Sequence, residues 1–299
     1  MLQNSKVLIV GSDGLVGASL FSSLVQIGVL VTPTTRRQIC TDDIEYFDLL
    51  IHEPDSLLKF KPDIVFITAA VTNISFCEQH PDLSSRINVT STVELAKVML
   101  SYGAFVIFIS SNTVFNGCIF NVSEDHPYCP TVRYGYQKAA AEQQLLALPN
   151  ANTNLTIVRL SKIVTPKAGI AAEFLSLIQD GKYVEPFYDL MFCPASISFV
   201  VKGLITIALS RKPGIFHLSG EEEMSYAQFA LSLTHAIGAD STLVKPITTT
   251  LKGIDVLFRP RHPALGMERT KNIFGIYPES SIQMINELVG SNQLCKSIK

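Results

Sequence analysis

The stretch Lys6-Val-Leu-Ile-Val-Gly11-Ser-Asp-Gly14-Leu-Val-Gly17 decides the fold. Its first part is apolar and β-branched and ends at a glycine, which is typical of a buried strand. Residues 15–27 then repeat apolar side chains at helical spacing and stop at Gly28, which predicts a helix. Glycines between a strand and a helix let the backbone approach a pyrophosphate, which the helix N-terminus stabilises. The spacing therefore predicts a dinucleotide site in which Asp13 points away from the phosphates, with a ligand-free turn as the alternative.

Short apolar runs continue to alternate with helical patterns up to about residue 165. Continuous apolar strands separated by helices predict a parallel sheet that is covered on both faces. Right-handed crossovers then favour an α/β fold with a doubly wound sheet of the Rossmann type. The expected strands are residues 6–10, 29–31, 63–68, 104–109 and 155–160, and the expected helices are 15–27, 82–102 and 132–148.

The alternation is looser in the second half of the chain. We expect residues 1–165 to form an NAD(P)-binding Rossmann domain and residues 166–299 a smaller C-terminal α/β part that binds substrate. No low-complexity linker separates the two, and residues 190–220 are expected to return to the Rossmann sheet. Helices are expected at 169–181, 196–209, 225–237 and 278–289, and a strand at 215–219.

Composition excludes several classes of protein. The 299 residues carry 24 Lys and Arg against 26 Asp and Glu, a net charge of −2 that argues against nucleic-acid binding. Only 17% of residues are charged, against about 25% in an average domain. The long uncharged runs 14–35 and 98–123 are interrupted by Ser, Asn, Gln and Pro, which disfavours a membrane span. We therefore expect a cytoplasmic protein without a membrane partner, and the apolar excess leaves a homodimer open.

The cysteines show no paired spacing such as C-x-x-C. In a chain without a signal-peptide core, the six cysteines are expected to be free thiols. His126 and His217 likewise lack a partner spacing for zinc or a catalytic triad and are interpreted as packed or loop residues. No metal is predicted.

Two arginines point to the choice of cofactor. About twenty residues beyond the glycines, an NAD site places an acid that binds the ribose hydroxyls. Arg36 and Arg37 occupy that place here, and arginine suits a 2′-phosphate, so NADP is favoured over NAD. Two solvated loop charges are the alternative interpretation. Asp48 is expected near the adenine edge.

Tyr134 and Lys138 are spaced to share one helix face. An ammonium beside a phenol, together with a helix N-terminus, lowers the phenol pKa and prepares the tyrosine for proton transfer near neutral pH. Ser110 and Ser111 follow the expected strand 104–109, at the carboxyl edge of the sheet where ligands bind. A hydroxyl there can polarise a carbonyl. The pattern predicts a carbonyl reductase.

In this order the motifs resemble those of extended short-chain dehydrogenases/reductases, in the NAD-dependent epimerase/dehydratase superfamily. Within it the chain looks most like dTDP-4-dehydrorhamnose reductases, over nearly its whole length and most clearly to about residue 165. The residues that carry the resemblance are Gly11-x-x-Gly14-x-x-Gly17, Ala69-Ala70, Asn88, Ser110-Ser-Asn-Thr-Val-Phe-Asn-Gly117, Glu124-Asp-x-x-x-x-Pro130, Tyr134-Gly-x-x-Lys138-x-x-x-Glu142 and Arg259-Pro260.

The resemblance implies NADPH-dependent reduction of the 4-keto group of a nucleotide-linked 4-keto-6-deoxy sugar in deoxysugar biosynthesis. The implied catalytic residues are Tyr134 as general acid, Lys138 on the nicotinamide ribose, Ser111 on the carbonyl and Asn88 with a proton-relay water. Implied cofactor contacts are Gly11, Gly14, Leu15, Val16, Gly17, Arg36, Arg37, Asp48, Ala69, Ala70 and Lys138, and implied substrate contacts are Ser111, Asn112, Thr113 and Arg259. For Arg259, a surface charge is the alternative interpretation.

Departures from the family pattern fall on the substrate contacts. Asn112-Thr113 stands where the family has Asp-Tyr, Lys162 where an aromatic residue is usual, and Ser198 and Gly266 where acids are expected. Without an acid pair beside Ser111, the acid–base work of a sugar dehydratase is excluded. Two alternatives stay open: a non-catalytic, NADP-binding regulatory subunit similar to the β subunit of methionine adenosyltransferase, and a nucleotide-sugar epimerase that recycles its cofactor.

Overall fold

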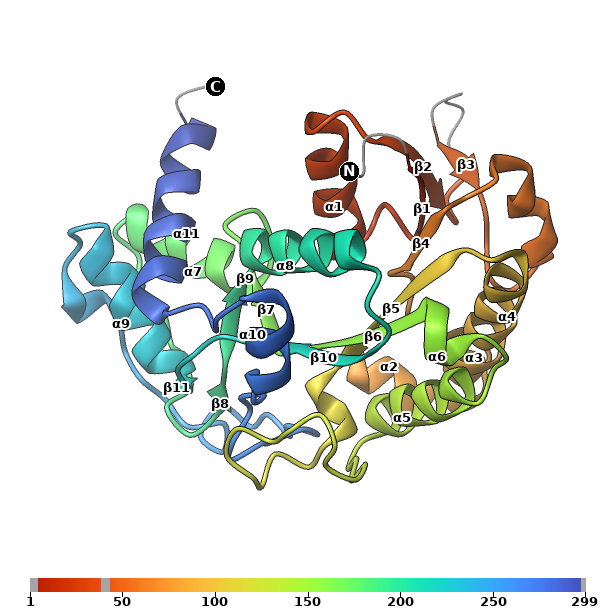
Figure 1. The fold of residues 1–299 in the computed structure, drawn as a ribbon. Coiled ribbons are helices and arrows are strands. Elements are labelled where there is room, and N and C mark those ends of the chain that lie inside the picture. The colour runs from red at the N-terminus through yellow and green to blue at the C-terminus, as the bar shows by residue number, and fades with distance from the viewer. Residues whose placement is uncertain (1–4, 39–43, 297–299) are drawn as a thin grey trace.

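The computed structural model describes residues 5–38 and 44–296, with the side chains of 291–296 left aside. Its centre is a seven-stranded sheet in the order β10-β6-β5-β4-β1-β2-β3 (Figure 1), and all its pairings are parallel. The order reverses between β1 and β4, where an open α/β sheet has its ligand crevice. The strands are β1 (Lys6–Val10), β2 (Leu30–Thr35), β3 (Glu45–Tyr46), β4 (Ile64–Ile67), β5 (Phe105–Ser111), β6 (Leu155–Leu160) and β10 (Gly214–Leu218).

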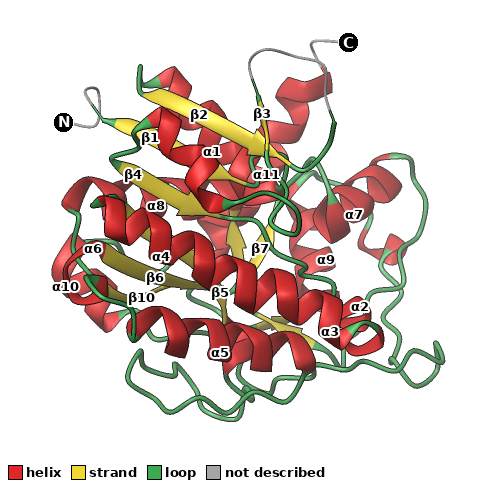
Figure 2. Ribbon diagram, turned by 90° about the vertical axis from the view of Figure 1, so that its right-hand side faces the viewer, coloured by secondary structure: helices red, strands yellow, loops and turns green. Residues whose placement is uncertain are grey.

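Helices cover both faces of this sheet (Figure 2). α1 (Leu15–Gln26) and α8 (Ile197–Ser210) pack on one face, and α4 (Thr92–Tyr102) and α5 (Arg133–Leu146) on the other. Successive strand residues enter opposite cores, because side chains alternate across a strand: Ile9 joins the α1 side and Leu8 the α4 side. The predicted doubly wound α/β fold is confirmed, and it explains why the strands are apolar without alternation.

One helix differs from its prediction. Residues 82–102 form α3 (Pro81–Ser85), a π-helical turn (Arg86–Ser91) and α4 rather than one continuous helix. The wider turn contains Asn88, whose buried side chain bonds the neighbouring loop at Val71. This contact lies outside the helix, so helical periodicity in the sequence could not predict it.

Strand β2 extends further than predicted and contains Pro33. β3 pairs only with Thr34 and Thr35, so β2 has a single neighbour, β1, at Pro33. A proline is tolerated there because it removes no ladder hydrogen bond. The missed strand β3 is only two residues long, too short for a periodic signal.

The C-terminal elements build a separate apolar core. It lies among α7 (Gly169–Gln179), α9 (Tyr226–Ala236) and α11 (Ser281–Lys296), which gather on one side of the molecule in Figure 1. Two small sheets join this region to the central one: β7 (Lys162–Val164) pairs with β9 (Pro194–Ser196), and β8 (Met191–Phe192) with β11 (Met224–Ser225). The short helices are η2 (Pro54–Phe60), α2 (Ile74–Gln79), η4 (Asn112–Val114), α6 (Ala151–Asn154), η5 (Ser241–Leu243) and α10 (Glu268–Phe274).

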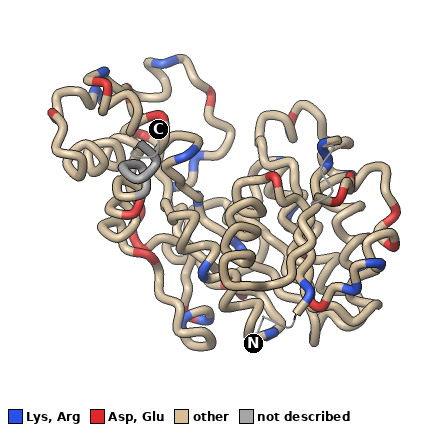
Figure 3. The backbone as a smooth tube through the Cα atoms, turned by 90° about the horizontal axis from the view of Figure 1, so that it is seen from above, with Lys and Arg blue, Asp and Glu red and all other residues tan. Residues whose placement is uncertain are grey.

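Charges in Figure 3 are spread along loops and helix ends, with long uncharged stretches of chain between them. Among the described residues, no helix has both the length and the apolar character needed to cross a bilayer. Cys77, Cys118, Cys129 and Cys193 are free thiols, whereas Cys40 and the side chain of Cys295 lie outside the described part of the chain. The described residues contain no cluster of three or more His, Cys, Asp or Glu arranged to hold a metal ion.

Candidate functional site

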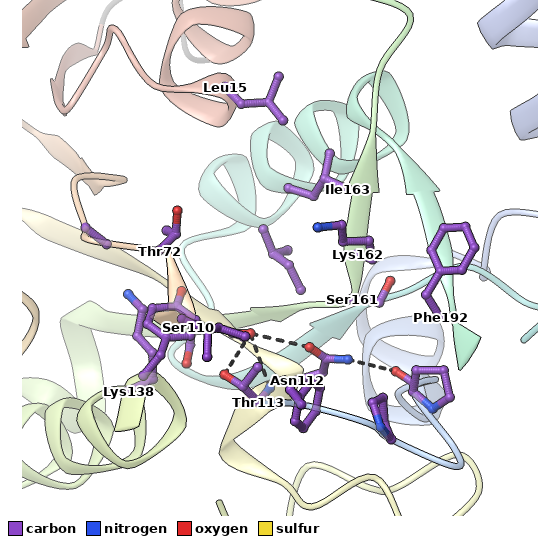
Figure 4. Close-up of a pocket in the computed structure, with 18 of the residues that line it drawn as sticks. Leu15, Thr72, Ser110, Asn112, Thr113, Lys138, Ser161, Lys162, Ile163 and Phe192 are labelled. Carbon is purple, nitrogen blue, oxygen red and sulfur yellow. Dashed lines mark hydrogen bonds between the residues drawn. The ribbon is translucent and has the colours of Figure 1, made fainter. Parts of the chain in front are cut away.

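Two adjoining cavities open at the carboxyl edge of the central sheet. The first, of about 660 Å³, lies between the ends of β5 and β6, the start of α1 and the C-terminal part (Figure 4). The second, of about 570 Å³, lies between the glycine loop, the end of β2 and residues 69–76. Four residues line both cavities, so the two form one continuous site: Gly14, Thr68, Ala70 and Thr72.

The three glycines of the first loop serve different purposes. A Cβ on Gly11 would lie 2.7 Å from the Ala69 nitrogen, and Gly11 has φ +94°; a Cβ on Gly17 would lie 2.2 Å from the Gly11 oxygen. Both glycines are therefore required by the fold itself. At Gly14 the nearest atom would be an ordinary 3.5 Å away. No contact among the described residues requires a glycine at 14, yet Gly14 lies where the two cavities meet, so a side chain there would occupy that space.

The start of α1 is open toward the first cavity. Gly14 is its N-cap and provides no side-chain cap. The first backbone N–H groups of a helix have no intrahelical acceptor, and with the helix dipole they attract an anion. Leu15, Val16 and Gly17 line the first cavity at this end. The uncapped N-terminus and the free space at Gly14 fit a dinucleotide pyrophosphate.

The second cavity holds the predicted cofactor charges Arg36, Arg37 and Asp48. Arg37 Nε lies 3.1 Å from Asp13 Oδ2, so the carboxylate beside the glycine loop is paired with a cation. The Arg36 side chain has no hydrogen-bond or ion-pair partner among the described residues. Asp48 accepts the Leu50 N–H at 2.9 Å through Oδ1, which shapes the turn at the cavity wall.

Ser111, Tyr134 and Lys138 line the first cavity together. β5 ends at Ser111, and α5 places Tyr134 and Lys138 one turn apart. α5 approaches the serine loop closely because of Gly135, where a Cβ would lie 2.1 Å from the Thr113 carbonyl oxygen. The Ser111 hydroxyl accepts hydrogen bonds from the backbone N–H of Thr113 at 3.2 Å and from its hydroxyl at 3.0 Å. Its own proton stays available, with only a long 3.4 Å contact to Asn112.

Burial changes the acidity of the tyrosine and the lysine in opposite directions. Burial raises the pKa of Tyr134, and nearby Cys77 adds to the effect. Burial lowers the pKa of Lys138 to about 8, although Glu142 and Cys77 oppose the shift. The Lys138 ammonium donates to the Ile109 carbonyl at 2.8 Å and lies 6.0 Å from the centre of the Tyr134 ring. The expected lowering of the tyrosine pKa by this lysine is therefore absent, and Tyr134 is a protonated phenol.

A buried polar network behind the site was missed in the sequence. Arg159, on β6, and Glu142, on α5, are almost fully buried and paired, with Nη2 2.7 Å from Oε2. The same carboxylate accepts hydrogen bonds from Ser110 and, at 3.0 Å, from Tyr128. Arg159 also contacts His217 at 3.4 Å, and burial lowers the pKa of that imidazole to about 3, so it is neutral. The sequence feature that could have indicated this network is the four-residue spacing between Lys138 and Glu142, which places both on one face of the same helix.

The predicted catalytic residue Asn88 lies outside both cavities. It is fully buried and hydrogen-bonded at both ends of its amide. Its oxygen accepts the Val71 N–H at 2.8 Å, while its nitrogen donates to the Val71 carbonyl at 2.9 Å and to Gln137 at 2.8 Å. This clamp fixes the loop between β4 and α2, next to the residues that line the second cavity.

The predicted substrate contacts separate into two groups. Asn112 and Thr113 line the first cavity, and the Asn112 amide donates to the Pro263 carbonyl at 3.0 Å. Arg259 is not among the lining residues, although its neighbours Phe258 and Pro260 are. Its guanidinium pairs with Asp189 at 2.9 Å and also contacts Thr249.

The other side of the first cavity comes from segments far along the chain. Residues 160–163, 190–192 and 255–258 line it, together with Tyr226, Pro260 and Pro263. In Figure 4 the amine of Lys162 points toward the middle of the cavity, between Ile163 and Asn112. Lys162 has no hydrogen-bond or ion-pair partner among the residues that the structure describes.

Comparison with known proteins then gives the family. The model of the RmlD substrate binding domain matches residues 5–293, nearly the whole chain. The chain belongs to the RmlD substrate-binding domain family. The resemblance to dTDP-4-dehydrorhamnose reductases within the epimerase/dehydratase superfamily is thereby confirmed.

Curated relatives of this RmlD-family chain carry different names. It is 26% identical over 285 residues to methionine adenosyltransferase 2 subunit beta of Xenopus laevis, covering 90% of this chain and 82% of the relative. It is 27% identical over 246 residues to the spore coat polysaccharide biosynthesis protein SpsK of Bacillus subtilis, covering 82% and 83%. The chain is therefore similar both to a protein named as a subunit of another enzyme and to a polysaccharide biosynthesis protein.

Solved structures share the fold of this RmlD-family chain. A dTDP-4-dehydrorhamnose reductase from Bacillus anthracis in complex with NADP has a TM-score of 0.83 at 21% identity, covering 96% of this chain and 99% of that one. MoeE5 in complex with UDP-glucose and NAD has a TM-score of 0.81 at 20% identity, covering 98% and 100%. At these identities the likeness establishes the fold.

Proposed function

We propose that the protein is an oxidoreductase that uses NADPH to reduce the 4-keto group of a nucleotide-linked 4-keto-6-deoxy sugar. The observation that carries the proposal is the convergence of Ser111, Tyr134 and Lys138 on one cavity, which is continuous with the cavity beside the glycine loop. In this proposal residues 1–165 hold the cofactor, and residues 166–299 complete the substrate cavity. The named neighbours, which bind NADP, NAD or UDP-glucose, support a nicotinamide cofactor and a nucleotide-sugar substrate.

Each residue then has a defined task. A bound nicotinamide would supply the hydride that reaches the carbonyl carbon. The Ser111 hydroxyl donates a hydrogen bond to the carbonyl oxygen, where negative charge develops. Tyr134, kept protonated by burial, transfers its proton to that oxygen, so the carbonyl becomes an alcohol. Lys138, charged below its lowered pKa of about 8, holds the ribose and stabilises the phenolate left behind.

Replacing the proposed acid tests the reaction. Tyr134→Phe removes the transferable proton but keeps the ring, and we expect kcat to fall by about 10²–10⁴-fold. NADPH consumption with dTDP-, GDP- and UDP-linked keto-sugars measures the effect. Tyr136→Phe is the matched control, because this neighbouring tyrosine is exposed on α5. Full activity of Tyr134→Phe would overturn the mechanism.

The NADP preference rests on Arg36. Its guanidinium has no partner among residues 5–38 and 44–296, whereas Arg37 is paired with Asp13. We expect Arg36→Ala to weaken NADPH binding by about tenfold or more while NADH binding changes little, as for the loss of one charged hydrogen bond. Arg37→Ala is the control with the smaller expected effect. Equal losses for the two cofactors would contradict the assignment.

A second candidate is a regulatory subunit that binds NADP without turnover. The relatives named methionine adenosyltransferase 2 subunit beta favour it. Tight NADPH binding, no reduction of any keto-sugar and stable association with a catalytic partner would support this candidate against the reductase. An epimerase, the third candidate, would convert its substrate without stoichiometric loss of NADPH.

A further inference from the structure

The first cavity contains a cation, Lys162, that no described residue neutralises. Its charged lining residues are Lys138, Lys162 and Asp255. Lys138 donates to the Ile109 carbonyl and lies over the Phe108 ring, at 4.3 Å from the ring centre. Lys162 makes no such contact with any described residue, and its amine points into the cavity (Figure 4).

The fold fixes the backbone at Lys162. Lys162 is the first residue of β7, whose backbone is fixed by pairing with β9 and by donation of the Lys162 N–H to the Cys193 carbonyl at 3.2 Å. The side chain is accessible from the cavity, yet the surrounding protein lowers its pKa by desolvation. An ammonium in a partly desolvated position is stabilised by a ligand that supplies hydrogen-bond acceptors. An anion bound in the cavity would stabilise the charged form of Lys162, which desolvation disfavours.

No acid that lines this cavity pairs with Lys162 among the described residues. Asp255, the only acid that lines this cavity, is exposed and makes no ion pair with Lys162 among the described contacts. The remaining lining residues near Lys162 are uncharged: Leu160, Ser161, Ile163, Leu190, Met191 and Phe192. The Ser161 hydroxyl is buried without a hydrogen-bond partner among the described residues, and Ser161 lines the same wall of the cavity.

We propose that Lys162, with Ser161 beside it, binds an oxyanion of the substrate and thereby determines which nucleotide sugars the cavity accepts. The inference rests on the proposed function, because it takes the first cavity as the substrate site. Two parts of a nucleotide sugar carry such oxygens: the diphosphate and a carboxylate on the sugar. If Lys162 binds a sugar carboxylate, the substrate is a sugar acid and not a 6-deoxy sugar.

Direct binding distinguishes the two sources. The NADP-loaded protein is titrated calorimetrically with UDP, UDP-glucose and UDP-glucuronic acid, using the wild type, Lys162→Met and Lys162→Arg. Lys162→Met keeps the length of the side chain and removes the charge. Lys167→Met, a lysine on the same segment that does not line the cavity, is the matched control.

The outcomes are distinct. If Lys162 binds the diphosphate, Lys162→Met weakens all three ligands by about tenfold or more, the effect of one charged hydrogen bond. If it binds a sugar carboxylate, only UDP-glucuronic acid weakens, and Lys162→Arg recovers part of the loss. Unchanged affinities in Lys162→Met, or no binding of any of the three ligands to the wild type, would overturn the proposal.

Turnover separates this inference from the proposed function. If the wild type and Lys162→Met reduce a keto-sugar with the same KM, the reductase function is supported and the oxyanion site is ruled out. Lys162-dependent binding without reduction of any keto-sugar would keep the oxyanion site and eliminate the reductase.

Discussion

The buried charges on one side of the first cavity all have protein partners, whereas the charges on the other side have none among the described residues. The α5 side, residues 110–111 and 134–142, is tied through Glu142 to Arg159 and through Lys138 to a backbone carbonyl. The C-terminal side, residues 160–163, 190–192 and 255–258, presents Lys162 and Asp255 to the cavity. A wall with all its charges paired holds reacting groups in place, and a wall with free charges is available to recognise different ligands.

The largest expected effect comes from breaking the buried pair behind the α5 side. Glu142→Gln keeps the shape of the side chain but leaves the Arg159 charge buried without a counter-ion. We expect the free energy of unfolding to fall by about 3–5 kcal/mol. Urea denaturation measures it. Glu45→Gln, which breaks the exposed pair with Lys59, is the control and should cost at most about 1 kcal/mol. Similar small losses in both variants would remove the contrast between the two sides.

The Asn88 clamp offers a test between a structural and a catalytic role. Asn88→Ala leaves the N–H and carbonyl of Val71 without their side-chain partner. We expect a loss of about 1–3 kcal/mol in unfolding free energy, because the Val71 N–H loses its partner and its carbonyl keeps only the 3.4 Å contact from the Cys77 thiol. The pH profile of kcat should keep its shape in the surviving folded fraction. A shifted profile at unchanged stability would instead support the proton-relay role.

Alkaline pH should weaken the binding of NADPH by the α5 side of the cavity. The pKa of Lys138 is about 8 in the protein against an ordinary 10.5. Above about pH 8 its charged fraction falls tenfold per pH unit, so the Kd for NADPH should rise in proportion. NADPH fluorescence titrations between about pH 6 and 10 follow this directly. Because the folded-state pKa is lowered, burial of the charged lysine costs stability below about pH 8, and this cost fades toward pH 10.5. A flat affinity up to pH 10 would contradict the assignment.

The smallest effect is expected at the hydrogen bond that joins the two sides. Asn112 on η4 donates to the Pro263 carbonyl at 3.0 Å. Asn112→Ala removes this bond, and we expect a loss of about 0.5–1.5 kcal/mol in substrate binding, seen as a higher KM with little change in kcat. Asn116→Ala, which removes a turn bond to Cys118 in the same loop, is the control. An equal change in both variants would assign the effect to loop stability.

Local patterns predicted most of the fold. The strands and helices of the first half are stabilised by apolar residues at fixed periods, so their positions follow from short windows of sequence. The break in the helix at 86–91 and the short strands β3, β7 and β9 were missed because they depend on contacts with distant segments. The glycine spacing indicated a phosphate site, but only the tertiary contacts distinguish Gly11 and Gly17, which the fold requires, from Gly14.

By itself, the sequence determined the doubly wound sheet and the family, because both depend on local periodicity and on motifs with fixed spacing. The tertiary structure alone decided that Arg159 pairs with Glu142, that Arg259 is held by Asp189, and that Lys162 faces the cavity with no ion-pair partner in the described part of the chain. Burial and pairing depend on residues brought together from distant parts of the chain. They control pKa values and charge recognition, which spacing in one segment does not encode.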